Sequence, residues 1–206
     1  MKRLLLILSA LLLLSDVIVG RERVEDKSCR MTFGAEWSYI ASFHCGIHHN
    51  FFSEEGYRVD LNHTSFGYKS NGDVYLHAGI ELHRKWNISM YTGLAGVYDI
   101  GKIIPISLRA TRYFKSNQMG DRWFSFLDAG TGVCIKKEPQ AALVGKLGGG
   151  YRIALSEVSN LDFVFAYRVT LTHPEIVFDD YKVPINMTNR NNAYISAISI
   201  GISLSF

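Results

Sequence analysis

The final stretch of the chain, residues 193–206, alternates between two kinds of side chain. Its apolar positions are Ile198, Ile200, Ile202, Leu204 and Phe206, and the positions between them are Ala197, Ser199, Gly201, Ser203 and Ser205. A period of two places neighbouring side chains on opposite faces of an extended strand. One apolar face and one face of small and polar residues are typical of a transmembrane β-barrel strand whose apolar side chains contact lipid. We therefore predict that this stretch is the closing strand of such a barrel.

The same strand carries a second pattern. Ser199, Gly201, Leu204 and Phe206 resemble the C-terminal signal that the outer-membrane assembly machinery reads in bacterial barrel proteins. The resemblance implies that this machinery is a partner during biogenesis. It also implies that outer-membrane lipid and lipopolysaccharide surround the folded barrel.

The N-terminus favours export. Lys2 and Arg3 precede an apolar run at residues 4–14, which is too short for a spanning helix of about 20 residues but suits a secretory signal peptide. We expect residues 1–20 to be removed, with Ile18 departing from the usual small-residue pattern before the cleavage site. An uncleaved anchor is the alternative. A periplasmic lead-in at 21–30 and a barrel at 31–206 complete the expected organisation.

Bulk composition excludes several classes. A formal net charge of +3 gives no case for a nucleic-acid partner. Three cysteines, an odd number, do not make a disulfide framework. The run 148–150 is three glycines, but no Lys-Ser/Thr pair and no helix signal follow it, so strand bending is a better interpretation than a phosphate cradle. We predict no cofactor.

The first strand settles which face points inward. Met31, Phe33, Ala35, Trp37, Tyr39, Ala41 and Phe43 alternate with Thr32, Gly34, Glu36, Ser38, Ser42 and His44. A charge towards lipid costs several kcal/mol, whereas a charge in the lumen can find a partner. Glu36 therefore predicts that the polar face is the interior.

Residues 45–101 allow two interpretations. Asn71-Gly72 is a strong hairpin signal that would join a strand at 57–69 to one at 74–83. In the rival interpretation residues 84–87 make the turn and 88–98 form the next strand. Accepting both gives nine strands, and bacterial single-chain barrels have even numbers. The clean alternation after Asn71-Gly72 favours the first interpretation, with 84–102 as a surface loop.

The other strands are expected near 104–113, 123–133, 143–153 and 161–170. Asp128 should face inward, which places Phe124 and Phe126 inside as well unless a bulge intervenes. The charged residues predicted to form a network that fills the lumen are Glu36, Glu81, Arg109, Asp128, Lys146, Arg152, Asp162 and Arg168. Eight strands leave an interior that side chains can fill, and paired structural charges are commoner than catalytic ones.

Several short patterns carry a family resemblance. They are Ile104-Pro105-Ile106 leading to Arg112-Tyr113-Phe114, residues 126–132, Gly149-Gly150-Tyr151-Arg152, Ala166-Tyr167-Arg168 and residues 199–206. With them the chain resembles the small eight-stranded outer-membrane β-barrel proteins abundant in the Bacteroides group, broadly of the OmpA/OmpX type. The resemblance implies an all-β, antiparallel, up-and-down barrel, and it carries over no catalytic residue.

Two kinds of chemistry compete with a purely structural role. His44, Cys45, His48 and His49 have the side chains of a zinc site, but they lack a second ligand pair, so we predict no metal. Barrel enzymes that trim or transfer lipid acyl chains share the fold. The last strand has serines at 196, 199, 203 and 205 but no histidine base, and His173 lies in the preceding loop, so the nucleophile-base signature of an enzyme is missing.

The sequence thus predicts a non-catalytic, porin-like but closed outer-membrane barrel with a structural or surface-interaction role. Its extracellular loops are expected at 46–56, 84–102 and 172–192, and its extracellular partner is not indicated. A soluble, lipocalin-like carrier of an apolar ligand, with Trp37 and Phe163 inside, is the remaining alternative.

Overall fold

The computed structural model describes residues 30–83, 85–98, 101–115, 120–135, 140–156, 158–179 and 181–206. The predicted signal peptide and nearly all of the lead-in lie outside these residues. Eight strands form one closed antiparallel barrel in the order β1-β10-β7-β6-β5-β4-β3-β2. They are β1 (Arg30–Phe52), β2 (Arg58–His83), β3 (Trp86–Val97), β4 (Gly101–Tyr113), β5 (Arg122–Cys134), β6 (Ala141–Ala154), β7 (Asn160–Thr172) and β10 (Thr188–Ser205).

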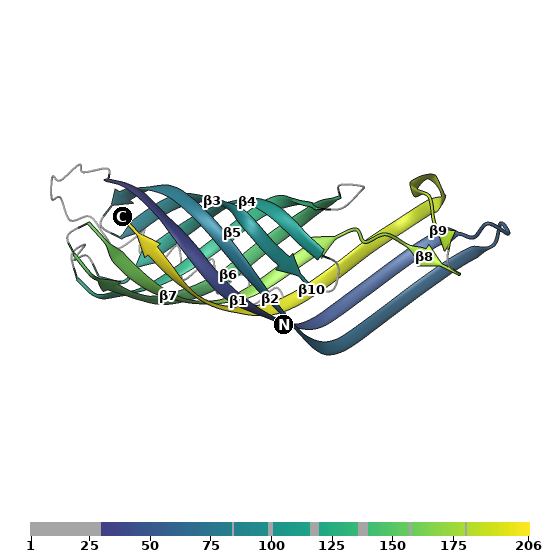
Figure 1. Ribbon diagram of the computed structural model, residues 1–206, viewed down its shortest axis with the longest axis horizontal. Coiled ribbons are helices and arrows are strands. Elements are labelled where there is room, and N and C mark those ends of the chain that lie inside the picture. The colour runs from purple at the N-terminus through teal and green to yellow at the C-terminus, as the bar shows by residue number, and fades with distance from the viewer. Residues whose placement is uncertain are drawn as a thin grey trace, which may run out of the picture.

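The predicted closing strand does close the barrel. β10 lies between β1 and β7, with Trp37 opposite Ile202 on one side and Phe165 opposite Ile200 on the other. Figure 1 shows β1 and β10, the first and the last strand of the barrel in the sequence, side by side. None of the helical segments in the described ranges has the length and apolarity that a membrane-spanning helix requires.

A belt of apolar side chains surrounds the barrel. Every barrel strand contributes a large apolar residue that is between 47% and 64% exposed, namely Trp37, Leu76, Met90, Leu108, Leu127, Leu147, Phe165 and Ile200. A belt to which every barrel strand contributes is unlike the limited apolar patches of a water-soluble protein and matches the lipid-facing band of a membrane barrel. The faces are therefore oriented as predicted, and the reversed, lipocalin-like arrangement is wrong.

Aromatic residues border the belt at both ends. At one end the Tyr39 and Tyr68 hydroxyl groups touch, and the Phe43 ring lies 6.4 Å from that of Tyr167. At the other end the Trp123 and Tyr151 rings are 4.9 Å apart. Aromatic girdles of this kind sit at the two membrane interfaces.

The second strand corrects the predicted hairpin at Asn71-Gly72. β2 runs unbroken from Arg58 to His83, and Asn71 and Gly72 pair with Ile40 and Tyr39 in its middle. The Asn71 side chain donates to the Tyr98 carbonyl at 3.1 Å. The two predicted strands at 57–69 and 74–83 are one strand, because β1 offers a continuous pairing partner along their whole length.

The predicted surface loop at 84–102 is also wrong. Most of it is β3, which pairs with β2 from Asp73 opposite Ala95 to His83 opposite Trp86. The rival interpretation, with 88–98 as a strand, is therefore the right one for the barrel wall. The predicted strand number is nevertheless correct, because a false turn adds one strand while the false loop removes one.

Three strands continue beyond the barrel rim and form an extended sheet, which we call the blade. It consists of residues 44–52 of β1, 58–66 of β2 and 188–192 of β10 (Figure 1). Residues 46–52, predicted as loop, thus belong to β1. The register shifts between Ser42 and His44 on both sides of β1, and such irregularities bend and twist a sheet. Because long excursions mark the outer side of these barrels, the blade is extracellular.

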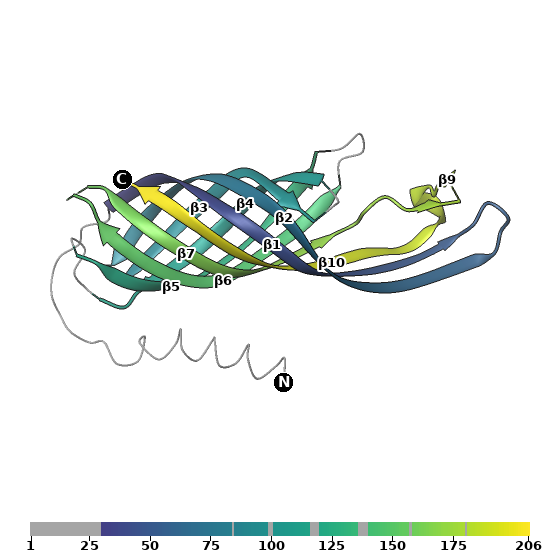
Figure 2. The ribbon, with the colours of Figure 1, turned by 60° about the horizontal axis from the view of Figure 1, so that its bottom comes forward.

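The segment predicted as a third loop, 172–192, is largely structured. It contains a small hairpin, β8 (Val177–Phe178) with β9 (Tyr181–Lys182), a turn of 3₁₀ helix at Ile185–Met187, and the first residues of β10. Figure 2 shows this segment leaving β7 and running beside the outer part of β10. The hairpin packs on the blade through Phe51, Ile176 and Val183, which are at most 6% exposed.

Candidate functional site in the lumen

All eight charged residues predicted for the lumen face the interior and are at most 7% exposed. Phe124 and Phe126 are buried beside them, and β5 alternates without a bulge, as predicted from Asp128. Burying an ionised side chain is costly unless it is paired and hydrogen-bonded. The contacts of each charge therefore determine what the lumen can do.

The central group surrounds Arg109. Its guanidinium contacts Glu36 at 2.5 Å and Asp128 at 3.1 Å, and it lies over the rings of Tyr91 and Phe126, 3.8 and 4.3 Å from their centroids. Arg109 and Asp128 are directly opposite each other on β4 and β5, whereas Glu36 reaches Arg109 across the lumen. One cation thus contacts two buried carboxylates.

A neighbouring group is built on Asp73. Lys146 Nζ lies 3.0 Å from Asp73 and 3.8 Å from Glu36, while an Arg168 nitrogen lies 3.5 Å from Asp73. Lys146 and Arg168 are cross-strand neighbours with like charges, an arrangement that repels unless an anion separates them. Asp73 and Glu36 supply that anion and link this group to Arg109.

A third group lies nearer the periplasmic end. Arg152 makes two hydrogen bonds of 2.7 Å to Asp162, the bidentate geometry that gives arginine–carboxylate pairs their strength. Arg122 contacts Glu81 at 3.0 Å. The Arg122 guanidinium also lies over the Tyr113 ring, 3.6 Å from its centroid. The aromatic rings Tyr113, Phe124 and Phe126 pack with Val164 and Ala166 around these charges.

Sequence reasoning missed two members of these groups, Asp73 and Arg122. Asp73 falls in the false turn, although it continues the inward positions Tyr75, His77 and Glu81 of β2. Arg122 precedes the expected start of β5 at Trp123 and shares the inward phase of Asp128. Extending each alternating pattern by one period would have found both. With them, the buried groups of this lumen network in the described residues comprise five carboxylates and five lysine or arginine side chains.

The extracellular half of the lumen holds a buried apolar cluster. Its members are Cys45, Tyr75, Tyr91, Ala95, Val97, Ile103, Cys134, Ala142, Val144 and Ile195. Cys45 and Cys134 are both free thiols in it, and the Cys134 sulfur lies 3.7 Å from the Thr172 hydroxyl. The lumen therefore holds packed side chains from its charged groups up to its outer mouth.

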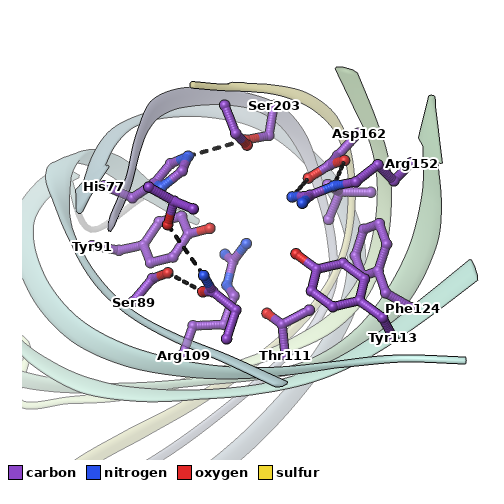
Figure 3. Close-up of a pocket in the computed structure, with 14 residues that line it drawn as sticks. His77, Ser89, Tyr91, Arg109, Thr111, Tyr113, Phe124, Arg152, Asp162 and Ser203 are labelled. Atoms are coloured by element: carbon purple, nitrogen blue, oxygen red, sulfur yellow. Dashed lines mark hydrogen bonds and ion pairs between the residues drawn. The ribbon is translucent and has the colours of Figure 1, made fainter. Parts of the chain in front are cut away.

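Beside Arg109 and Arg152 lies a cavity of about 20 Å³. Figure 3 shows its lining side chains pointing into the barrel, with His77 and Ser203 facing each other. The His77 Nε2 is 3.4 Å from the Ser203 hydroxyl, and the His77 ring stacks on Tyr91. This serine–histidine contact, between strands that are far apart in the sequence and both flank β1, was not predicted. The cavity has room for about one water molecule and none for an acyl chain, so its geometry gives no support to lipid hydrolysis.

The four metal candidates of the sequence lie on the blade and do not converge. His44 stacks edge-on against Phe66 and Tyr194, and Cys45 is buried in the lumen cluster. His48 bonds to Asp60 at 2.9 Å, a contact that lowers the pKa of the Asp60 carboxyl. Burial first, and then the neighbouring His48, lower the pKa of His49. Within the described ranges no three metal-ligating side chains come together.

The residues of the terminal pattern divide between the two faces of β10. Ser199 and Gly201 point inward and are buried, whereas Leu204 and Phe206 are exposed on the lipid face. The backbone of Phe206 makes two hydrogen bonds with Phe33, which holds the end of the chain on β1. Recognition of this pattern by an assembly machinery stays a prediction.

Comparison with known proteins gives the fold and no family. No protein-family model matches the chain, and no curated protein sequence matches it. Among solved structures, the outer membrane protein OprG from Pseudomonas aeruginosa is similar over 87% of this chain and 97% of its own, with 12% identity and a TM-score of 0.54. Neisserial surface protein A, at 12% identity over 87% of this chain and 99% of its own, has a TM-score of 0.48.

The lipid-facing belt, the two aromatic girdles and the strand order all come from this chain itself. Together with the structural likeness they identify it as an eight-stranded, antiparallel, up-and-down β-barrel of the bacterial outer-membrane type.

Proposed function

We propose that this chain is a non-catalytic outer-membrane barrel, closed to solutes, that serves to present its blade to a protein outside the cell. The observation that carries the proposal is the unequal length of the strands. β1, β2 and β10 have 23, 26 and 18 residues, whereas the other barrel strands have 12 to 14. Crossing the membrane needs only about 9–11 residues per strand. The additional residues of β1, β2 and β10 therefore serve a purpose outside the membrane.

The lumen supports the closed state in this proposal. Five carboxylates and five lysine or arginine side chains contact one another across it, and aromatic and aliphatic side chains pack in the outer half. An ion entering this path would have to replace contacts that neutralise buried charges, and the cost of an unpaired buried charge is large. The barrel therefore acts as a rigid, plugged support.

Purified protein in planar lipid bilayers is expected to show no stable single-channel conductance. The reason is the filled lumen, and the measurement is the current at about ±100 mV in about 1 M salt, conditions under which an open aqueous pore conducts readily. A matched variant, Glu36→Ala with Arg109→Ala, removes the central pair and should admit transient current. A steady open level in the unmodified protein would refute the closed barrel.

The blade has one open edge. Residues 58–66 of β2 pair with β1 on one side and with no other strand in the described part of the chain. Leu61 and Phe66 on this edge are 44% and 79% exposed. Unpaired edges are templates for an added strand, and proteins usually shorten or cover them. The opposite edge of the blade, on β10, is covered by the segment that carries β8 and β9.

Around Asp60 the two faces of this edge differ in polarity, which specifies the partner. Val59 and Leu61 lie on the face that carries the Phe51 cluster. The other face carries Asp60, which accepts hydrogen bonds from His48 and from Asn50 at 2.9 and 2.8 Å. A fitting partner is an extended polypeptide segment, apolar on one face and polar on the other, that adds to β2 as a further strand.

An eight-residue peptide of alternating valine and threonine is expected to bind this edge. Binding should slow hydrogen exchange of amides within 58–66, and Leu61→Lys should weaken it about tenfold because edge lysines oppose strand addition. Val177→Lys changes an exposed apolar residue on β8 and should bind normally. No protection within 58–66, or full binding by Leu61→Lys, would reject the proposal, as would protection that rises with protein concentration alone, since that indicates self-association.

A further inference from the structure

A second extracellular site lies at the covered edge of the blade, away from β2. A cavity of about 480 Å³ opens between the first residues of β10, the segment 173–185 and the start of β6. Its size falls in the range of small-molecule sites, about 300–1,000 Å³. The proposed strand-adding partner would use the other edge, so this cavity is a separate feature.

The walls of the cavity are held in place by hydrogen bonds. His173 Nδ1 donates to the Asn191 carbonyl, and the Asn191 side-chain amide donates to the Pro174 carbonyl. The Val183 amide donates to the Ile176 carbonyl at 3.0 Å, and both side chains belong to the buried cluster under the hairpin. The first two bonds attach the covering segment to β10, and the third closes the segment on itself while its side chains pack on Phe51 of β1, so the site is formed before a ligand arrives.

The polar lining is rich in carboxamides. Gln140, Asn189, Asn191 and Asn192 all line the cavity, and the Asn191 side-chain oxygen is buried without a hydrogen-bond partner in the described residues. A carboxamide both donates and accepts, and so does a hydroxyl group. Ile176, Val183 and Ile185 add an aliphatic patch. This combination suits a ring with many hydroxyls on its rim and C–H groups on its face.

The charges of the lining favour an anionic group on that ligand. Lys182 and Glu175 neutralise each other at 3.5 Å. Arg190 also lines the cavity and makes no ion pair with any residue in the described ranges. A guanidinium has the geometry to donate two parallel hydrogen bonds to a carboxylate or phosphate.

We propose that this cavity binds an acidic saccharide, with the carboxamides meeting its hydroxyls and Arg190 its carboxylate or phosphate. A purely apolar ligand would leave the carboxamides unpaired, which is costly. A nucleobase would need an aromatic platform, and the imidazole of His173 is the one ring among the lining residues. The sugar comes either from phosphorylated lipopolysaccharide in the same membrane or from uronic-acid glycans outside it.

Binding is tested by calorimetry on the refolded full-length barrel in lipopolysaccharide-free detergent. The probes are the phosphorylated core oligosaccharide released from lipopolysaccharide, a uronic-acid disaccharide, and uncharged lactose. An acidic probe should bind at least about tenfold more tightly than lactose, and Arg190→Gln should remove that advantage, because hydrogen bonds to charged groups are the stronger ones. Whichever acidic probe binds more tightly identifies the source.

Lys102→Gln is the matched control, because it removes an exposed cation of β4 at the same rim but outside the cavity lining. It should leave the affinity unchanged. Equal affinity for lactose and both acidic probes, no heat of binding with any probe, or an equal loss in Lys102→Gln and Arg190→Gln would each overturn the proposal. Strand addition at 58–66 is measured separately, so either proposal can fail while the other stands.

Discussion

Arg109→Ala is expected to lower the free energy of unfolding by about 3–5 kcal/mol, because it leaves Asp128 without its cation and Glu36 with only the longer contact to Lys146, 3.8 Å away. Glu36 and Asp128 are 1% and 2% exposed, and Arg109 contacts both at 2.5 and 3.1 Å. The measurement is urea unfolding in lipid vesicles, followed by tryptophan fluorescence and by the gel shift between folded and heated barrel.

The control for this prediction separates unpaired charge from lost packing. A triple variant, Glu36→Gln, Asp128→Asn and Arg109→Met, removes the charges together, and buried ion pairs replaced in this way are often neutral or stabilising. It should recover most of the lost stability. If Arg109→Ala unfolds like the unmodified protein, or if the triple variant is worse than the single one, the central group is not an electrostatic unit.

Ile200→Lys should cost about 2–4 kcal/mol in the same unfolding experiment, because a charge at the middle of the lipid face is expensive. Ile200 is 57% exposed on the belt. Exposure alone would predict little effect, since surface substitutions away from special features usually change stability by about 0.5 kcal/mol or less. The size of the loss in unfolding free energy therefore shows whether lipid or water surrounds the side chain at position 200.

Ile185→Lys provides the matched comparison. Ile185 is 82% exposed but belongs to the extracellular segment before β10, where a lysine side chain in its place would be in water. Its replacement should change stability by less than about 0.5 kcal/mol. Equal small effects at both positions would mean that water surrounds the belt, and the membrane assignment would fall.

The pattern of single residues predicted the barrel wall well. Glu36 oriented the first strand, Asp128 set the phase of β5 together with Phe124 and Phe126, and all eight named charges are buried in the structure. Such reasoning works here because the side-chain period of a strand is a local property. A barrel wall between lipid and a polar interior repeats that property in every strand.

The errors arose where local signals compete with distant partners. Asn71-Gly72 favours a turn when considered alone, yet Ile40 and Tyr39 of β1 pair with it and keep β2 extended. The length of β1, which continues to Phe52, was itself hidden because its outer part lacks the apolar alternation that lipid imposes. Mistaking that part for a loop concealed the blade.

The alternation of apolar and polar residues in the sequence determined that this protein is a membrane barrel. It also determined which face of each strand contacts lipid. Only the tertiary structure decided which charges touch, since Glu36 and Arg109 are 73 positions apart and meet through barrel closure. It also decided that β1, β2 and β10 extend beyond the membrane and that the segment carrying β8 and β9 folds against them. The physical reason is that periodicity acts between neighbours, whereas pairing and packing depend on the register of strands far apart in the chain.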